Sequence, residues 1–345
     1  MSKRVPRIAI VKSNFYQDLW VTDKTSDPLT LFKSSMMRCP PIGLAELYSA
    51  EFIIVRLLDE YPCTETIAEL PAEHLATLTQ SKKGKNPTLP FLHEEYHGDL
   101  SLESVAHHPD SIDWSQYDII LTINACIPAR ITSKFPKTLW CYWIGENNGP
   151  NIETCLQGYN VILNQDVTFP LNSVSVGFPY TFLGPNTLET LFSSGSERTG
   201  VFMEINNTTE RPVVKIPEEF QKIERETGHA ILRHNQDILK NADALCKAKY
   251  FVKIMGRGIR GNSLIEAISA GVLILVNTEL VRYKNLCIPM CHIVNEHDAI
   301  EKIKYFDENP EEYATIIAWQ KEYLRIHYQE KPMEKIIQCW KTLTP

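Results

Sequence analysis

The segment with the clearest arrangement for chemistry is a glycine-rich turn between a predicted strand at 250–255 and a predicted helix at 263–270. Glycine lets a backbone approach a ligand closely. The first amides of a helix have no partner within the helix and favour an anion. Arg257 and Arg260 lie in the turn and can donate charge-assisted hydrogen bonds to phosphate. The segment therefore predicts a pyrophosphate site, whose glycines are Gly256, Gly258 and Gly261.

The three glycines also match Gly-x-Gly-x-x-Gly, the turn of dinucleotide-binding Rossmann domains. Glu279 lies past the next predicted strand, where an acid can hold a ribose. That motif usually follows the first strand of its domain, whereas here a predicted strand at 201–205 and a predicted helix at 238–248 precede it. An NAD(P)-dependent oxidoreductase is therefore the alternative function for this turn.

The residues from Ser263 to Val276 resemble the Glu-Ala-x-x-x-Gly-x-x-x-x-Val signature in the C-terminal domain of GT-B glycosyltransferases, which include the group 1 and exostosin-like families. The resemblance implies that Glu266 holds the ribose hydroxyls of a nucleotide-sugar donor and that the helix N-terminus faces the pyrophosphate. The other expected donor-binding residues are Arg257, Arg260, Gly258, Gly261, Asn262, Ser263 and Leu264, together with Glu204 and Asn206 at the end of the predicted strand 201–205.

Further phrases extend the resemblance over about residues 175–340. The residues from Ser175 to Phe182 look like the phrase that closes the N-terminal domain of the family, and 293–313 looks like its tail. Retaining group 1 enzymes often carry a second glutamate eight residues before the first, where this chain has Gly258. The sequence contains no Asp-x-Asp. These departures favour an inverting, metal-independent transfer without a cofactor, in which the helix terminus and arginines stabilise the leaving group.

The chain has 345 residues, which suits two domains. Predicted strands alternate with helices, which indicates an α/β fold with parallel sheets. The resemblance implies two Rossmann-like domains (GT-B) facing an inter-domain cleft. We expect an acceptor-binding domain at 1–183, a nucleotide-sugar-binding domain at 184–333, and a helix within 334–345 that crosses back to the first domain.

The remaining predicted elements follow the apolar patterns of the chain. Residues 44–61 fit either one amphipathic helix or a helix followed by a strand at 52–58. The other predicted strands are 8–11, 119–123, 139–144, 161–163 and 272–277, and the other predicted helices are 299–306, 311–327 and 334–340.

An inverting transfer needs a base within hydrogen-bond reach of the acceptor hydroxyl. In α/β domains such groups follow the carboxyl ends of strands. Glu146 follows the strand 139–144 and is the first candidate, and Asp166 and Asp18 follow two other strands. Aromatic faces suit sugar rings, so we expect an acceptor site on the loop after the first strand, at Phe15, Tyr16 and Trp20.

Two further functions are considered. His93 and His97 fit the His-Glu-x-x-His pattern of zinc proteases. Pro90 and Gly98 leave little more than two turns of helix around them, which is a poor support for two zinc-binding imidazoles. The other function is a non-catalytic nucleotide-sugar binder, which would bind nucleotide without turnover.

The composition narrows the class of protein. The chain is 43% hydrophobic and 22% charged, as in globular proteins, and its formal net charge of -7 disfavours nucleic-acid binding through a broad basic surface. No apolar stretch reaches the length of a membrane span and no signal peptide is recognised. We therefore expect a soluble, cytoplasmic enzyme whose partners are a nucleotide sugar and a glycan or other acceptor.

Overall fold

The structure is a computed structural model of the whole chain, and it divides into two compact units. Unit 1 comprises Met1–Phe182 and Glu330–Pro345, and unit 2 comprises Leu183–Gln329. The residues that the structure describes are 4–13, 48–55, 108–123, 126–144, 157–164, 174–177, 198–205, 215–234, 238–259 and 262–343.

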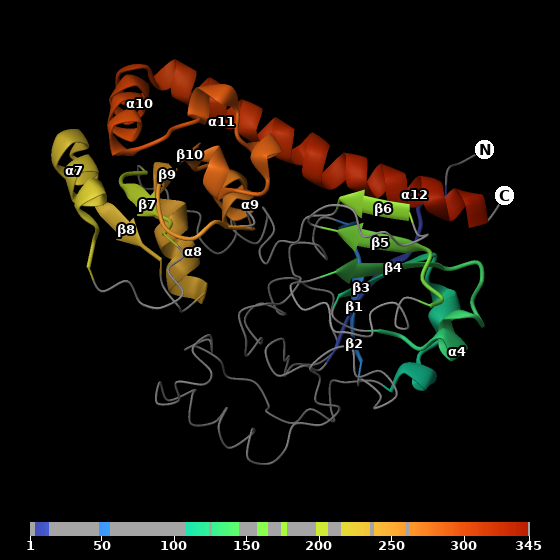
Figure 1. The fold of residues 1–345 in the computed structure, drawn as a ribbon. Coiled ribbons are helices and arrows are strands. Elements are labelled where there is room, and N and C mark those ends of the chain that lie inside the picture. The colour runs from blue at the N-terminus through green and yellow to red at the C-terminus, as the bar shows by residue number, and fades with distance from the viewer. Residues whose placement is uncertain are drawn as a thin grey trace, which may run out of the picture. The chain divides into compact units, whose positions relative to one another are not determined.

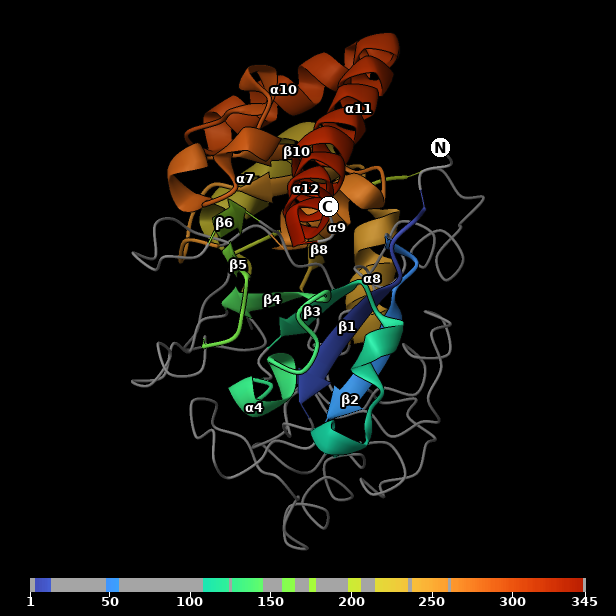
Figure 2. The same ribbon diagram turned by 90° about the vertical axis from the view of Figure 1, so that its right-hand side faces the viewer.

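Unit 1 is built on a six-stranded parallel sheet with the order β2-β1-β3-β4-β5-β6 (Figures 1 and 2). The chain runs from β1 outward to β2 and then returns past β1 to β3. A ligand crevice is expected where such a reversal occurs, outside the carboxyl ends of β1 and β3. The strands are β1 (Ile8–Ser13), β2 (Glu51–Val55), β3 (Ile119–Ile123), β4 (Leu139–Ile144), β5 (Val161–Asn164) and β6 (Val174–Gly177).

The core of unit 1 explains why its central strands are continuous apolar runs. All five residues of β3 are buried, as expected for a parallel sheet covered on both faces. Trp140 of β4 packs edge-on against Trp114 and Tyr159. The helix α12 (Lys331–Leu343) contacts β4 and β6 from the other end of the chain. The short helices are η2 (Pro109–Ser111), η3 (Trp114–Gln116) and α4 (Ala129–Thr132).

Unit 2 has a four-stranded parallel sheet with the order β10-β9-β7-β8. Its chain also reverses direction across the sheet, between β7 and β9. The strands are β7 (Val201–Met203), β8 (Ile231–Arg233), β9 (Tyr250–Lys253) and β10 (Leu273–Val276). The helices are α7 (Glu218–Thr227), α8 (Ile238–Lys247), α9 (Asn262–Ser269), α10 (Glu296–Glu308), α11 (Pro310–Leu324), the π-helix η7 (Arg325–Glu330) and the 3-10 turns η4 (Thr278–Leu280), η5 (Lys284–Leu286) and η6 (Pro289–Cys291).

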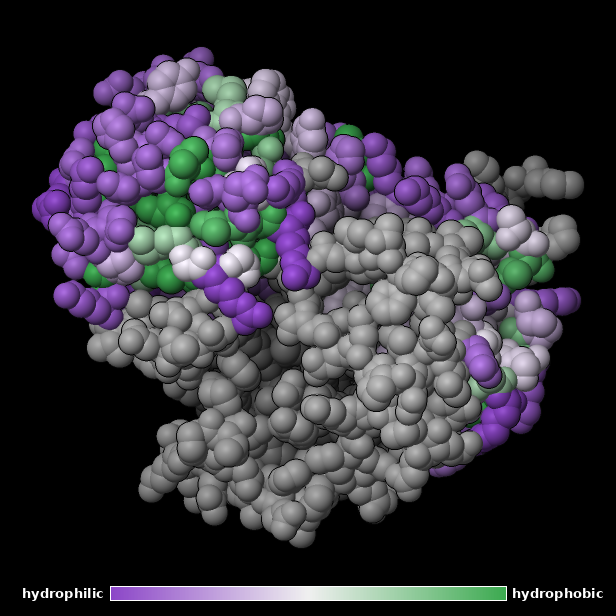
Figure 3. Space-filling view, in the orientation of Figure 1, coloured by the Kyte–Doolittle hydropathy of each residue, from purple (hydrophilic) through white to green (hydrophobic). Residues whose placement is uncertain are grey.

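Side-chain alternation along the strands gives unit 2 two apolar layers. Tyr250 and Val252 of β9 belong to a buried cluster with residues of α7 and α10, which pack on each other. Phe251 points to the opposite face, where its ring stacks on that of Phe202 at 5.7 Å. On the face seen in Figure 3, polar and charged residues of unit 2 surround a more hydrophobic area.

The structure confirms the α/β class with a parallel sheet in each half of the chain. The predicted strands 119–123 and 139–144 have the observed bounds, and the ambiguous segment 44–61 contains the strand β2. The sequence prediction missed α7 and β8. Within the described part of the chain, no helix is both long and apolar enough to cross a membrane.

A side chain from α11 pairs with the outer edge of β10, the edge that faces away from β9. The buried Gln320 amide accepts a hydrogen bond from the Ile274 N–H and donates one to the Ile274 carbonyl, both at 3.3 Å. Its Nε2 also lies 3.4 Å from the Cys291 sulfur. A backbone N–H and C=O that would otherwise be left without partners in the core are therefore satisfied.

We predict that Gln320→Leu lowers the free energy of unfolding by about 1–3 kcal/mol, because it leaves two buried backbone groups of β10 unpaired. Chemical denaturation of the two proteins measures this difference. Ala318→Leu adds the same side chain at an exposed position of the same helix and is the matched control. Equal stability of the Gln320→Leu variant and the control would contradict the role of the amide.

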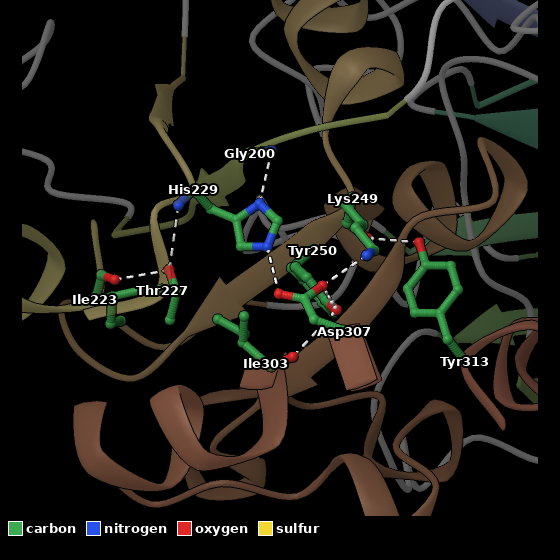
Figure 4. A network of polar contacts seen from close by, with 9 residues as sticks. All are labelled: Gly200, Ile223, Thr227, His229, Lys249, Tyr250, Ile303, Asp307 and Tyr313. Carbon is green, nitrogen blue, oxygen red and sulfur yellow. Dashed lines mark hydrogen bonds and ion pairs between the residues drawn. The ribbon is translucent and has the colours of Figure 1, made fainter. Parts of the chain in front are cut away.

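At the amino ends of the strands, Asp307 of α10 gathers three hydrogen-bond donors (Figure 4). Lys249 Nζ lies 2.6 Å from Oδ1, the Tyr250 hydroxyl 2.8 Å from Oδ1, and His229 Nε2 2.7 Å from Oδ2. The Gly200 N–H donates to His229 Nδ1 at 3.3 Å, which assigns the imidazole proton to Nε2. One carboxylate thus ties α10 to the start of β9 and to the turn before β8.

Partial burial acts to raise the pKa of Asp307, but the hydrogen bonds from Lys249, His229 and Tyr250 outweigh it, so this pKa lies below its usual value. A carboxyl with a lowered pKa in the folded state contributes stability above its unfolded pKa and loses it as the pH falls. We predict that Asp307→Asn costs about 1–3 kcal/mol at pH 7. The cost should shrink below about pH 4, the unfolded-state value for Asp.

Urea unfolding of wild type and variant from pH 7 to pH 3 measures this dependence. Asp243→Asn removes an exposed carboxylate that pairs with Lys247 and serves as the control, because such surface pairs contribute little. A constant difference between wild type and Asp307→Asn across the whole range would contradict the proposed electrostatic origin.

Candidate functional site

The candidate site lies where the sheet of unit 2 reverses direction, outside the carboxyl ends of β7 and β9. Open α/β sheets bind ligands at this position, because the loops leaving the two strands separate there. Glu204 and Ile205 follow β7, and residues 254–259 leave β9 toward α9. The glycine-rich turn found in the sequence is thus placed at the reversal point of unit 2.

A buried lysine organises this end of the sheet. Lys253, the last residue of β9, is fully buried. Its Nζ donates to three backbone carbonyls, at 3.0 Å to Ile205, 2.7 Å to Met255 and 2.8 Å to Arg257. An ammonium has three N–H donors, and these carbonyls match them in number. The side chain therefore joins the end of β7 to the loop after β9.

Glu204 is the neighbouring charge. The register Met203↔Val252 places Glu204 beside Lys253, and the Glu204 N–H donates to the Val252 carbonyl at 3.1 Å. Glu204 is 5% exposed. Burial lowers the pKa of Lys253 to about 8, and the negative charge of Glu204 opposes the shift. In the structure the charge of Glu204, a predicted donor-binding residue, acts on Lys253.

Gly256 is required by the fold of the loop itself. Its φ of +79° is one that residues with side chains rarely adopt. A Cβ at this position would lie 2.0 Å from the Ile205 carbonyl oxygen, which also accepts from Lys253. The sequence prediction explained the glycines by their approach to a ligand, and in the structure Gly256 also approaches the chain that follows β7.

At its end nearer α9, the loop is held by a backbone contact that resembles strand pairing. Ile259 forms an isolated parallel bridge with Val281, its N–H donates to the Leu280 carbonyl at 2.8 Å, and its carbonyl accepts from Arg282. Between the two anchors, residues 256–258 are exposed. The loop is thus fixed at both ends while its tip stays accessible.

The helix α9 begins at Asn262, one residue before the predicted start. Leu264 is fully buried, so only its backbone remains for a ligand, and Ser263 is partly buried. Glu266 lies in the second turn of the helix and is 9% exposed. Its charge helps to raise the pKa of Cys246 on α8, although burial of the thiol is the larger cause.

The loops that carry the other predicted residues lie outside the described residues. They begin at the carboxyl ends of strands that the structure does place. The loop with Phe15, Tyr16, Asp18 and Trp20 follows β1, and Glu146 and Asp166 follow β4 and β5. Of these strands, only β1 borders the reversal point of unit 1. Arg260, Gly261, Asn206, His93 and His97 also lie outside the described residues, as does the side chain of Asn262.

Sequence reasoning missed Lys253. The only signal for it was a lysine that ends an otherwise apolar strand directly before the glycines. Among the described residues, no group of three or more His, Cys, Asp or Glu side chains is arranged to hold a metal ion.

Known proteins are similar to this chain only in structure. No protein family model and no curated protein sequence matches it. A Listeria monocytogenes protein named as a UDP-N-acetylglucosamine 2-epimerase is similar with a TM-score of 0.47 and 11% identity, over 97% of this chain and 96% of its own. A Neisseria meningitidis UDP-GlcNAc 2-epimerase has a TM-score of 0.46 and 11% identity, over 97% and 100% of the two chains.

An α-glucosyltransferase in complex with UDP and a 13-mer DNA has a TM-score of 0.47 and 9% identity, over 98% of this chain and 100% of its own.

We predict that Gly256→Ala destabilises unit 2 by about 1–3 kcal/mol, because the new Cβ meets the Ile205 carbonyl and the backbone conformation is strained. Gly258→Ala is the matched control, since a Cβ there would lie 3.6 Å from the Leu280 carbonyl oxygen, an ordinary contact. Unfolding curves of the two variants make the comparison. An equal, small effect of both substitutions would contradict the close approach at Gly256.

Proposed function

We propose that the chain is a GT-B glycosyltransferase that moves a sugar from a nucleoside-diphosphate sugar to a glycan or other acceptor. The observation that supports this most directly is the exposed glycine loop at the reversal point of unit 2, which leads into α9 and its Glu266. Backbone amides and a helix N-terminus at this position suit a pyrophosphate. In the proposal, unit 2 binds the donor and Glu266 holds its ribose.

The chemical step is assigned to unit 1. The candidate bases Glu146, Asp18 and Asp166 follow strands whose carboxyl ends share one edge of its sheet. In the proposal one of them takes the proton of the acceptor hydroxyl, and the aromatic residues after β1 bind the acceptor. The reaction inverts the configuration of the anomeric carbon of the sugar and needs no metal. The leaving nucleoside diphosphate is stabilised by the amides of the loop, Arg257 and Arg260.

We predict that one nucleoside diphosphate, from a panel of UDP, GDP, their sugars, NAD and NADP, raises the melting temperature of the protein, because ligand that binds only the folded state stabilises it. Glu266→Gln should weaken the binding of that nucleotide by about tenfold or more, since it replaces a charged hydrogen-bond acceptor by a neutral one. Glu279→Gln removes an exposed carboxylate that pairs with Lys284 and is the control.

The same panel separates the alternatives. Stabilisation by NAD or NADP alone, lost in Glu279→Gln, would replace the transferase by an oxidoreductase. A nucleotide shift without sugar transfer to any acceptor would indicate a binder, and conversion of the sugar nucleotide without an acceptor would indicate another nucleotide-sugar enzyme. Zinc bound to the purified protein without a nucleotide shift would support the motif at His93 and His97.

A further inference from the structure

Lys253 is a buried ionisable group of unit 2 that the proposed reaction does not use. It lies beneath the loop at 254–259, and its three N–H groups are taken up by backbone carbonyls. It therefore has no donor left for a ligand. Its effect on ligand binding has to pass through the two loop carbonyls that it holds, those of Met255 and Arg257.

Because a peptide bond is planar and trans, these two contacts also fix the direction of two backbone N–H groups. In such a unit the C=O of one residue and the N–H of the next point in opposite directions. The carbonyls of Met255 and Arg257 point inward to Nζ. The N–H groups of Gly256 and Gly258 therefore point away from Nζ, toward the exposed side of the loop. Within the described residues, neither N–H donates to another backbone carbonyl.

We propose that Lys253 is a positioning residue for nucleotide binding, because its ammonium turns the amides of Gly256 and Gly258 outward as a phosphate-binding pair. This inference depends on the proposed nucleotide site and adds a cause for the shape of that site. Backbone amides that face the same side of a loop can form an anion-binding concavity. The positive charge beneath the loop also favours an anion above it.

Anion binding then depends on the protonation of Lys253, although Lys253 does not contact the anion. A neutral amine has only two N–H groups, so deprotonation leaves one of the three carbonyls without its donor. The pKa of Lys253 is about 8, lowered by burial and partly restored by Glu204, so the change falls within an accessible range. Nucleotide affinity should therefore decrease as the pH rises through 8.

The free energy of unfolding, in contrast to nucleotide affinity, should increase as the pH rises. The unfolded chain keeps its proton up to a pKa of about 10.4, whereas the folded chain releases it near 8. Between these values the unfolded state binds more protons, so this group makes the free energy of unfolding rise with pH. A purely structural lysine would show this rise with no loss of affinity, which separates the two roles.

We predict that Lys253→Met weakens binding of UDP or GDP by more than about tenfold, and that wild-type affinity falls by about five- to tenfold between pH 7 and pH 9 while the variant shows no such decrease. When only the protonated form binds, affinity falls by at most about tenfold per pH unit above the pKa. Calorimetric titration at each pH measures the affinities. Lys247→Met removes an exposed lysine next to the same strand and should behave as wild type.

The outcomes distinguish this inference from the function on which it depends. If wild type binds UDP or GDP and Lys253→Met binds it equally, with the same pH profile, the positioning role is wrong and the proposed function stands. If wild type binds neither nucleotide, both are wrong. If Lys253→Met does not fold, spectra of ¹⁵N-glycine-labelled wild type decide, with the Gly258 signal assigned by Gly258→Ala.

In those spectra, the Gly258 amide should move on addition of UDP or GDP, and in the free protein it should titrate near pH 8. A Gly258 signal that neither nucleotide nor pH moves would overturn the proposal.

Discussion

Burying an ammonium group away from water costs several kcal/mol unless its N–H groups find acceptors and a counter-charge lies near. In unit 2 these conditions are met only while the end of β7, the loop after β9 and the side chain of Lys253 keep one arrangement. The register of β7 against β9 brings Glu204 beside the lysine, and Gly256 lets the loop approach Ile205. The shape of the candidate site thus depends on one buried charge.

In unit 2 the amino ends and the carboxyl ends of the strands differ in how tightly they are held. At the amino ends of the strands, Asp307 accepts hydrogen bonds from three donors in two segments of the chain. The buried ring of Tyr250 packs edge to face against the partly buried ring of Tyr313 beside it. At the carboxyl edge, residues 256–258 are exposed between two anchors. A rigid sheet fixed at one edge can present an accessible loop at the other without losing its core.

The sequence predicted those parts that follow from apolar patterning. The strands β3 and β4 are apolar except for Thr122, as expected for parallel strands buried on both faces. In contrast, β8 has three half-exposed or exposed residues, and α7 buries only Phe220 and Ile223 among polar residues, so neither gives a clear pattern. Lys253 was missed because backbone carbonyls are its partners, and no residue type or spacing encodes a carbonyl.

The position of the glycine turn within the sheet bears on the choice between the two nucleotide folds. In the dinucleotide-binding fold, with strand order 3-2-1-4-5-6, two strands lie beyond the motif strand on one side. Here the motif strand is β9, and on the side of β10, the strand that follows it in the chain, β10 is the only strand among the described residues. The outer edge of β10 is occupied by the Gln320 amide and by a bridge to His292, so no further strand can pair there. The side chain that closes the sheet therefore favours the proposed transferase over the oxidoreductase.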